Sequence, residues 1–143
     1  MPKHTTDTDK GAKHILGQLE KGEVGVEAGL FDPGLAQIGA YNEYGTKDIP
    51  ARPFIRTTSD NKRSQWDAFM DKELNDLAKG KGTIKSSLVA LGADMETDIK
   101  KTITDWKSPP NAPSTQKQKR GVDNPLIDTG AMRNSVSFKV KGV

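Results

Sequence analysis

The chain of 143 residues contains no cysteine, which excludes disulfide scaffolds and metal sites built on thiolates. It also has little apolar material, since only 33% of its residues are hydrophobic and 6% are aromatic. A single domain of this length buries roughly two-thirds of its unfolded surface. So small a fraction of apolar residues predicts that contacts with neighbouring subunits bury part of the apolar surface. A monomer with long solvated loops is the alternative.

Long apolar runs are missing as well. The first ten residues, MPKHTTDTDK, lack the apolar centre of a signal peptide. No later run approaches the roughly 20 apolar residues that a membrane-spanning helix needs. The sequence therefore predicts a soluble protein with no membrane partner, which resides where it is made or assembled.

The net charge of +3 is concentrated in the last third of the chain. Residues 107–143 carry seven Lys and Arg against two Asp and Glu, and the densest cluster is KQKR at 117–120. A basic loop rich in Pro, Ser and Gln, without interleaved aromatic residues, is typical of a solvated linker. A basic nucleic-acid-binding module that uses this C-terminal third is the alternative.

Two segments alternate between apolar and other residues, as strands with one buried face do. They cover 23–30, with Val24, Val26, Ala28 and Leu30 on one face, and 134–141, with Val136, Phe138 and Val140 inward. We expect these strands to pair in one small sheet. A turn at 32–34 leads into a short helix that ends at Tyr44 and Gly45.

Other segments have helical periodicity. A short amphipathic helix is predicted over 9–20, and two long helices begin near Asp60 and about Thr83, joined by a hinge at 79–82. The expected apolar stripe of the first long helix is Trp66, Phe69, Met70, Leu74 and Leu77, and that of the second is Ile84, Leu88, Leu91, Met95, Ile99, Ile103 and Trp106.

Residues 107–125 contain four prolines, which predict a long connector without regular structure. The predicted fold class is α+β: a small, mostly antiparallel sheet packed by amphipathic helices, with this Pro-rich connector before the C-terminal strand. We expect one domain over 1–143 with an extended loop at 107–125.

The stretch LIDTGA at 126–131 matches the nucleus of aspartic proteases. Only thirteen residues follow Gly130, and the chain before it is mostly helical, so the protease architecture cannot be built. We expect Asp128 or Thr129 to cap a helical turn that extends to Met132. A DxDxG string at 7–11, GKGT at 80–83 and the two histidines also lack the partners that metal or phosphate sites need. The sequence predicts no enzyme, no cofactor and no metal.

The most informative stretch is YNEYGTKDIPARPF at 41–54. Tyr41 and Tyr44 close a short apolar run, and two prolines then restrict the backbone. This pattern predicts that Phe54 and Ile55 are presented from a stiff loop, for packing against another surface. Phe54 in the subunit's own core is the alternative.

This stretch, together with the block NAPST at 111–115 and NPLIDTGAM at 124–132, resembles the pattern of tailed-bacteriophage neck and minor tail-component proteins. The first motif is matched by Tyr41, Glu43, Tyr44, Gly45, Pro50, Arg52, Pro53 and Phe54, and the second by Leu126, Asp128, Thr129, Gly130 and Met132.

The resemblance implies a structural protein of the virion head–tail junction, assembled in the bacterial host cytoplasm as a homo-oligomeric ring. It implies a hexameric ring, with a dodecamer as the alternative, close to packaged DNA. Its partners would be other neck and connector proteins and tail-terminator or tail-tube proteins. The residues expected in subunit or partner contacts are Tyr41, Tyr44, Arg52, Phe54, Ile55, Leu126 and Met132.

Overall fold

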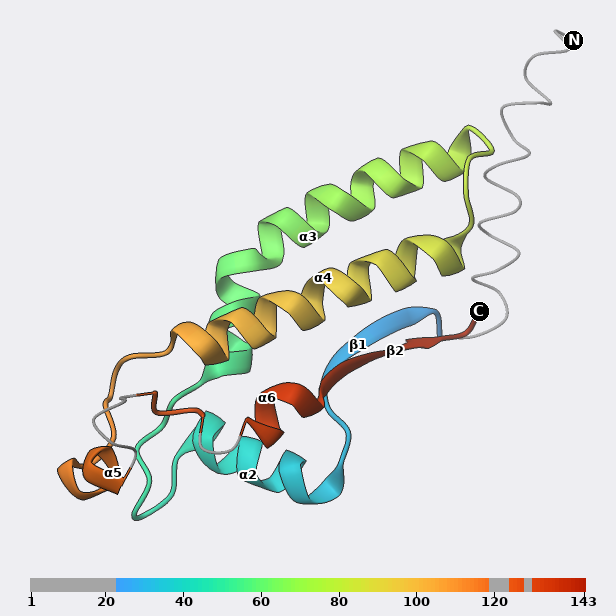
Figure 1. The fold of residues 1–143 in the computed structure, drawn as a ribbon. Helices are drawn as coiled ribbons and strands as arrows, with labels where there is room; N and C mark the ends of the chain where they lie inside the picture. Colours follow the sequence, from blue (N-terminus) through green and yellow to red (C-terminus); the bar gives the residue numbers. More distant parts are fainter. Residues whose placement is uncertain (1–22, 119–123, 128–129) are drawn as a thin grey trace, which may run out of the picture. The chain divides into compact units, whose positions relative to one another are not determined.

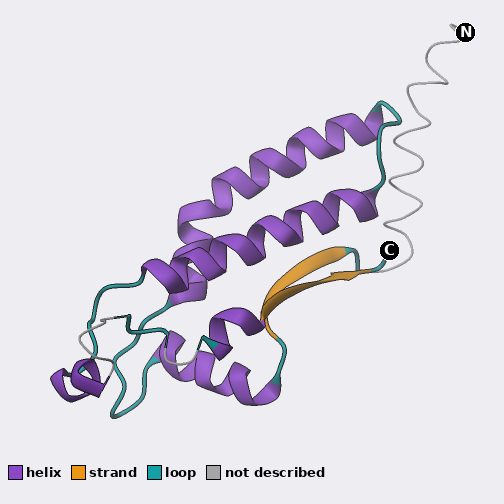
Figure 2. Ribbon diagram, in the orientation of Figure 1, coloured by secondary structure: helices purple, strands orange, loops and turns teal. Residues whose placement is uncertain are grey.

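The computed structural model describes residues 23–118, 124–127 and 130–143 (Figure 1). The helix predicted over 9–20 lies outside these residues. The elements, in chain order, are β1 (Gly25–Leu30), α2 (Pro33–Tyr44), α3 (Phe54–Ala78), α4 (Ile84–Asp105), α5 (Pro113–Gln118), α6 (Ala131–Ser135) and β2 (Val136–Lys141). Helices account for most of the described chain (Figure 2).

The predicted α+β class is confirmed. The two strands, one near each end of the sequence, pair as an antiparallel two-stranded sheet. On its polar face the Lys141 ammonium donates to Glu27 Oε1 at 2.6 Å. This hydrogen bond, together with the attraction between the two charges, raises the pKa of Lys141 above its ordinary value. Period-two alternation was therefore enough to identify both strands.

Helix α2 begins at Pro33 because Asp32 caps it. The Asp32 carboxylate accepts the backbone N–H of Leu35 at 3.0 Å, and Pro33 occupies the first helical position, where no N–H is needed. The predicted turn at 32–34 is thus the first turn of the helix.

Helix α3 begins at Phe54, six residues before the predicted start near Asp60. The polar run from Arg56 to Asn61 offers no apolar period that would indicate a helix. The start is instead set by Pro53 before the first turn and by acceptors that Glu43 supplies to it.

By its contacts the chain divides into two compact units. In the described residues, unit 1 comprises 23–28, 63–95 and 138–143, and unit 2 comprises 29–62, 96–118, 124–127 and 130–137. Segments of both long helices belong to each unit, and the single domain expected over 1–143 stays a prediction.

The core of unit 1 consists of Leu77, Ile84 and Leu88, against which Met70, Val24, Val26 and Val140 pack. Gly92 makes room for the ring of Phe138, since a Cβ at this position would overlap that ring. The helix stripes differ in burial. Of the seven positions predicted for the second stripe, five are buried, all of them on α4. On the first stripe, which lies on α3, Leu77 alone is buried and Leu74 remains 42% exposed.

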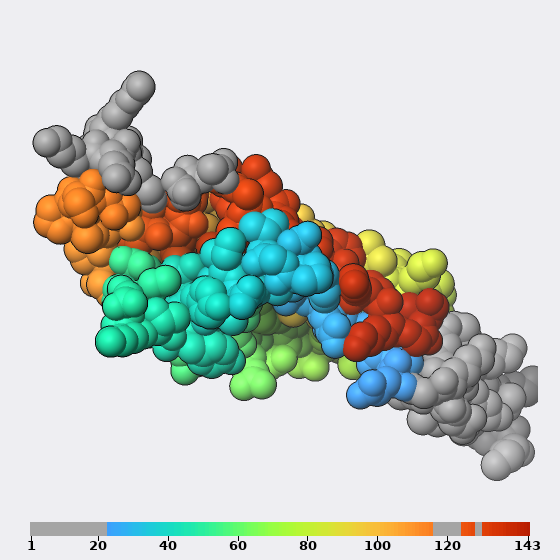
Figure 3. Space-filling model, turned by 90° about the horizontal axis from the view of Figure 1, so that it is seen from below, coloured from blue at the N-terminus to red at the C-terminus, as the bar shows by residue number. Residues whose placement is uncertain are grey.

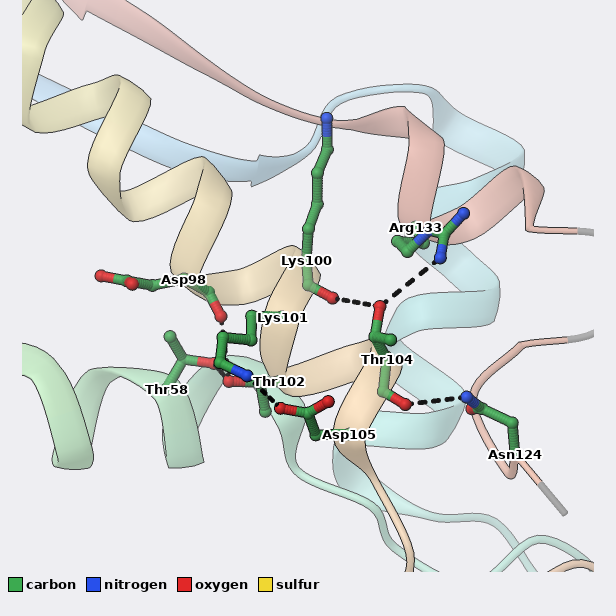
Figure 4. A network of polar contacts seen from close by, with 9 residues as sticks. All are labelled: Thr58, Asp98, Lys100, Lys101, Thr102, Thr104, Asp105, Asn124 and Arg133. Atoms are coloured by element: carbon green, nitrogen blue, oxygen red, sulfur yellow. Dashed lines mark hydrogen bonds and ion pairs between the residues drawn. The ribbon is translucent and has the colours of Figure 1, made fainter.

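Unit 2 buries Phe54, Ile103, Leu126, Met132 and Val136. In Figure 4 the hydroxyl of Thr58 donates to that of Thr102 at 2.7 Å, and Asn124 Nδ2 donates to the Thr104 carbonyl at 2.8 Å. The side chain of Asn124 thereby ties the end of the connector to the last turn of α4.

Two predictions about the connector region change. The absence of regular structure over 107–125 is wrong, because α5 begins at Pro113, a residue that suits the first turn of a helix. The helical turn predicted to extend to Met132 is present as α6, but α6 covers Ala131–Ser135 and so continues three residues beyond Met132. It follows Gly130, which is in the left-handed conformation with φ 83°. The expected capping residues, Asp128 and Thr129, lie outside the described residues.

Candidate subunit interface

The first motif folds as a tight loop that returns to the end of α2. Gly45 has φ 75°, and its N–H donates to the Tyr41 carbonyl at 2.8 Å. A Cβ at Gly45 would lie 2.9 Å from the nitrogen of Ala51, so glycine alone fits without strain. The Thr46 hydroxyl oxygen then accepts the N–H of Ile49 at 3.0 Å, which closes the loop.

Glu43 connects α2 to the first turn of α3. Its two carboxylate oxygens accept the N–H groups of Ile55 and Arg56, each at 2.9 Å, although Glu43 is only 7% exposed. The first N–H groups of a helix have no partner within the helix, and a negative charge there is also favoured by the helix dipole. Glu43 is therefore a structural cap for α3, supplied from another helix.

Arg52 connects the same loop to the Pro-rich connector. Its Nε donates to the Pro109 carbonyl and its Nη2 to the Pro110 carbonyl, both at 2.8 Å. The backbone N–H of Arg52 donates to the Asn42 carbonyl at 2.5 Å. The planar guanidinium suits two acceptors side by side, which a lysine cannot match.

Four of the seven predicted contact residues are buried inside the chain and so do not form a free surface: Arg52, Phe54, Leu126 and Met132. The presentation of Phe54 from a loop is wrong. Phe54 is the first residue of α3, is 0% exposed and lies next to Gly39, where a Cβ would stand 3.6 Å from its ring. The alternative, that Phe54 belongs to the subunit's own core, is confirmed.

The other three predicted residues remain accessible. Tyr41 is 42% exposed, Tyr44 is 76% exposed and Ile55 is half-buried. They are accompanied by Ile38, 48% exposed, which was not among the predicted contacts. Ile38, Tyr41 and Tyr44 are spaced by three residues on α2, and we name them the α2 stripe. The spacing of three is visible in the sequence, but only the structure shows that all three side chains are accessible.

The exposed surface of α2 carries no charged side chain. Glu43 is the one Asp, Glu, Lys or Arg of α2 and it is buried, although these four residue types make up 29% of the whole chain. Gln37 adds polarity without charge, since its Nε2 donates to the Tyr41 hydroxyl at 2.7 Å. Loss of charge and enrichment in tyrosine are the features that distinguish the centre of a protein interface from other surface.

Two hollows adjoin α2, which lies uncovered on the face seen in Figure 3. One has a volume of about 510 Å³ and is lined by Leu30, Ala36, Gly39, Ala40, Glu43, Tyr44, Ile55, Arg56, Ser59 and Asp60. The other, of about 240 Å³, is lined by Leu35, Ile38, Asn42, Pro125, Leu126, Gly130, Ala131 and Met132. Stripe residues thus border concave surface that a partner's side chains can enter.

The second motif lies beside the first. Helix α2 packs against α6, and the smaller hollow is lined by residues of both motifs. Segments some 80 residues apart in the sequence therefore contribute to one surface of unit 2, although their juxtaposition does not follow from either motif alone.

Across the described ranges, no group of three or more acidic or histidine side chains is placed to hold a metal ion. Nor does that part of the chain contain a helix long and apolar enough to cross a membrane. No protein-family model, curated protein or solved structure matches the chain.

Proposed function

We propose that this protein is a non-enzymatic structural subunit of a tailed-bacteriophage neck, which forms a ring that joins head and tail around the DNA channel. The observation that carries the proposal is the α2 stripe, an uncharged and accessible surface with two tyrosines. The two tyrosines belong to the motif on which the resemblance to neck proteins rests.

The internal contacts of the motif support this reading. Glu43, Gly45, Arg52 and Phe54 each have a structural role within unit 2, as cap, turn, anchor and core residue. No role in substrate chemistry is needed to account for them. These residues hold α2 in place, and the residues of the motif that are exposed on that helix are Tyr41 and Tyr44.

A closed ring needs a heterologous contact, in which one surface of a subunit meets a different surface of the next. The α2 stripe supplies one such surface. Full burial of a large apolar side chain contributes on the order of 2 kcal/mol, and a ring repeats that contribution at every subunit contact. Sixfold symmetry is the proposed form, with twelvefold as the alternative.

The test is removal of this protein from the phage that encodes it. We expect filled heads and complete tails to accumulate separately, and the protein supplied in trans to join them. Mass measurement of intact virions gives its copy number, which we expect to be six or twelve. Normal joined particles without the protein, or its absence from virions, contradict the proposal.

A further inference from the structure

A pocket of about 380 Å³, lined mostly by residues with polar or charged side chains, lies in unit 2, where the start of α3 and the end of α4 meet the connector. Its lining residues are Thr57, Asn61, Lys62, Asp98, Lys101, Thr102, Asp105, Trp106, Lys107 and Ser108. The volume falls within the range of roughly 300–1,000 Å³ that is usual for small-molecule sites. The α2 stripe has no part in this pocket.

The charges around the pocket are unevenly compensated. Lys101 donates to Asp105 Oδ2 at 2.6 Å, as Figure 4 shows, and this hydrogen bond raises the pKa of Lys101. Asp105 is thereby matched. Lys62 and Lys107 make no ion pair with any described residue. With three lysines against two acids, Asp98 and Asp105, the lining has a net charge of +1. The ammonium groups of Lys62 and Lys107 are available to an anionic ligand.

Trp106 supplies a second, independent observation. Its indole Nε1–H is buried and has no hydrogen-bond acceptor in the part of the chain that is described. A buried donor without an acceptor costs free energy, and native structures seldom keep one without a reason. A ligand oxygen that enters beside the indole, with a small adjustment of the ring, supplies the missing acceptor.

We propose that this pocket binds the phosphate group of a nucleotide, either free or within a single strand. Lys62 and Lys107 neutralise the phosphate, and Asn61 and Ser108 add neutral donors. The indole donates from Nε1 and offers an apolar surface to the base. The pocket exceeds the size of a lone phosphate ion, which favours an oxyanion that carries a nucleoside.

The experiment titrates the intact protein by calorimetry with inorganic phosphate, with dAMP and with a short deoxyadenosine oligonucleotide. We expect dAMP or the oligonucleotide to bind more tightly than inorganic phosphate. If the nucleotide is recognised alone, dAMP and the oligonucleotide bind equally. If it is recognised within a strand, the oligonucleotide binds more tightly and its affinity falls with salt.

The decisive experiment uses a double variant of the pocket, Lys62→Gln with Lys107→Gln. Its control is a second double variant, Lys72→Gln with Lys85→Gln, which changes two exposed lysines of unit 1. The pocket variant should bind about tenfold more weakly or worse, since it loses hydrogen bonds to a charged group. If the ligand is a single strand, the slope of the logarithm of the binding constant against the logarithm of salt concentration should become shallower by roughly 1.4 in the pocket variant. The control variant should change neither quantity.

Trp106→Phe tests the donor itself. It should weaken ligand binding severalfold while leaving the melting temperature of the free protein unchanged or higher, because the unmatched N–H is gone. Equal weakening in the control lysine variant, no preference for the nucleotide over inorganic phosphate, or no binding by the unaltered protein overturns the proposal. None of these results bears on ring formation through α2.

Discussion

The carboxylate of Glu43 accepts the backbone N–H of Ile55 at 2.9 Å, so the last turn of α2 caps the first turn of α3. The partners lie twelve residues apart, on either side of the proline loop. The carboxylate can accept this N–H group only while α2 holds its orientation. The orientation of α2 and the position at which α3 begins are therefore coupled.

Removal of the Glu43 carboxylate should therefore lower the stability of the folded protein. Glu43→Ala leaves two N–H groups without their acceptor in a buried site, and we expect it to lower the free energy of unfolding by about 2–3 kcal/mol. Glu43→Gln, which keeps one acceptor oxygen, should lose less. Urea denaturation followed by circular dichroism measures both. Glu96→Gln, which breaks a half-exposed i,i+4 pair with Lys100, is the control and should cost under about 0.5 kcal/mol.

The start of α3 shows why part of the fold could not be predicted. The strands and the α4 stripe follow from local periodicity, which the sequence displays directly. The cap of α3 comes from another helix, and the acceptors of Arg52 are 57 and 58 residues away. Contacts between residues so far apart in the chain produce no periodic pattern in the sequence. For the same reason Phe54, whose neighbours suggested a loop, proved to be a core residue.

Arg52→Lys tests the anchor on the connector. A lysine keeps the charge but cannot donate to the two proline carbonyls at once, and we expect a loss of about 2 kcal/mol in unfolding free energy. The connector should also become more accessible, which trypsin cleavage after Lys107 measures. Arg63→Lys, on an exposed part of α3, should leave both quantities unchanged. Equal cleavage rates in the two variants would contradict the role given to Arg52.

Gly92→Ala sets two effects of opposite sign against each other. Helix propensity favours alanine by about 1 kcal/mol. The added methyl group, however, would overlap the ring of Phe138, and overpacking of this kind costs typically 1–3 kcal/mol. We expect net destabilisation in thermal unfolding. In a Phe138→Leu background the same change should be neutral or stabilising, and a cost that persists there would remove Phe138 as its cause.

Phe54→Ala should destabilise the isolated subunit. Phe54 is 0% exposed, and truncation of such a side chain typically costs 3–5 kcal/mol. For a chain of this size the melting temperature should fall by on the order of 10 °C. Ile55→Ala, at the half-buried neighbouring position, should have a smaller effect. A stable Phe54→Ala monomer that fails to assemble would instead restore the original interpretation of Phe54 as a contact residue.

Tyr44→Lys should prevent assembly while leaving the stability of the isolated subunit almost unchanged. Tyr44 is 76% exposed, so its replacement should change the unfolding free energy by no more than about 0.5 kcal/mol. A lysine in the centre of an uncharged interface should nevertheless prevent assembly and joining of heads to tails. Val89→Lys places the same charge at another exposed apolar position, 40% exposed on α4, and should leave assembly intact. Equal assembly by both variants would exclude the α2 stripe from the contact.

The most direct test of the ring is a rotational average of isolated head–tail junctions by electron microscopy. The account predicts a closed ring of this protein, with six subunits preferred over twelve, in which Ile38, Tyr41 and Tyr44 of every subunit are covered by a neighbour. A junction without this protein, or a ring in which the α2 stripe faces solvent on every subunit, would contradict it.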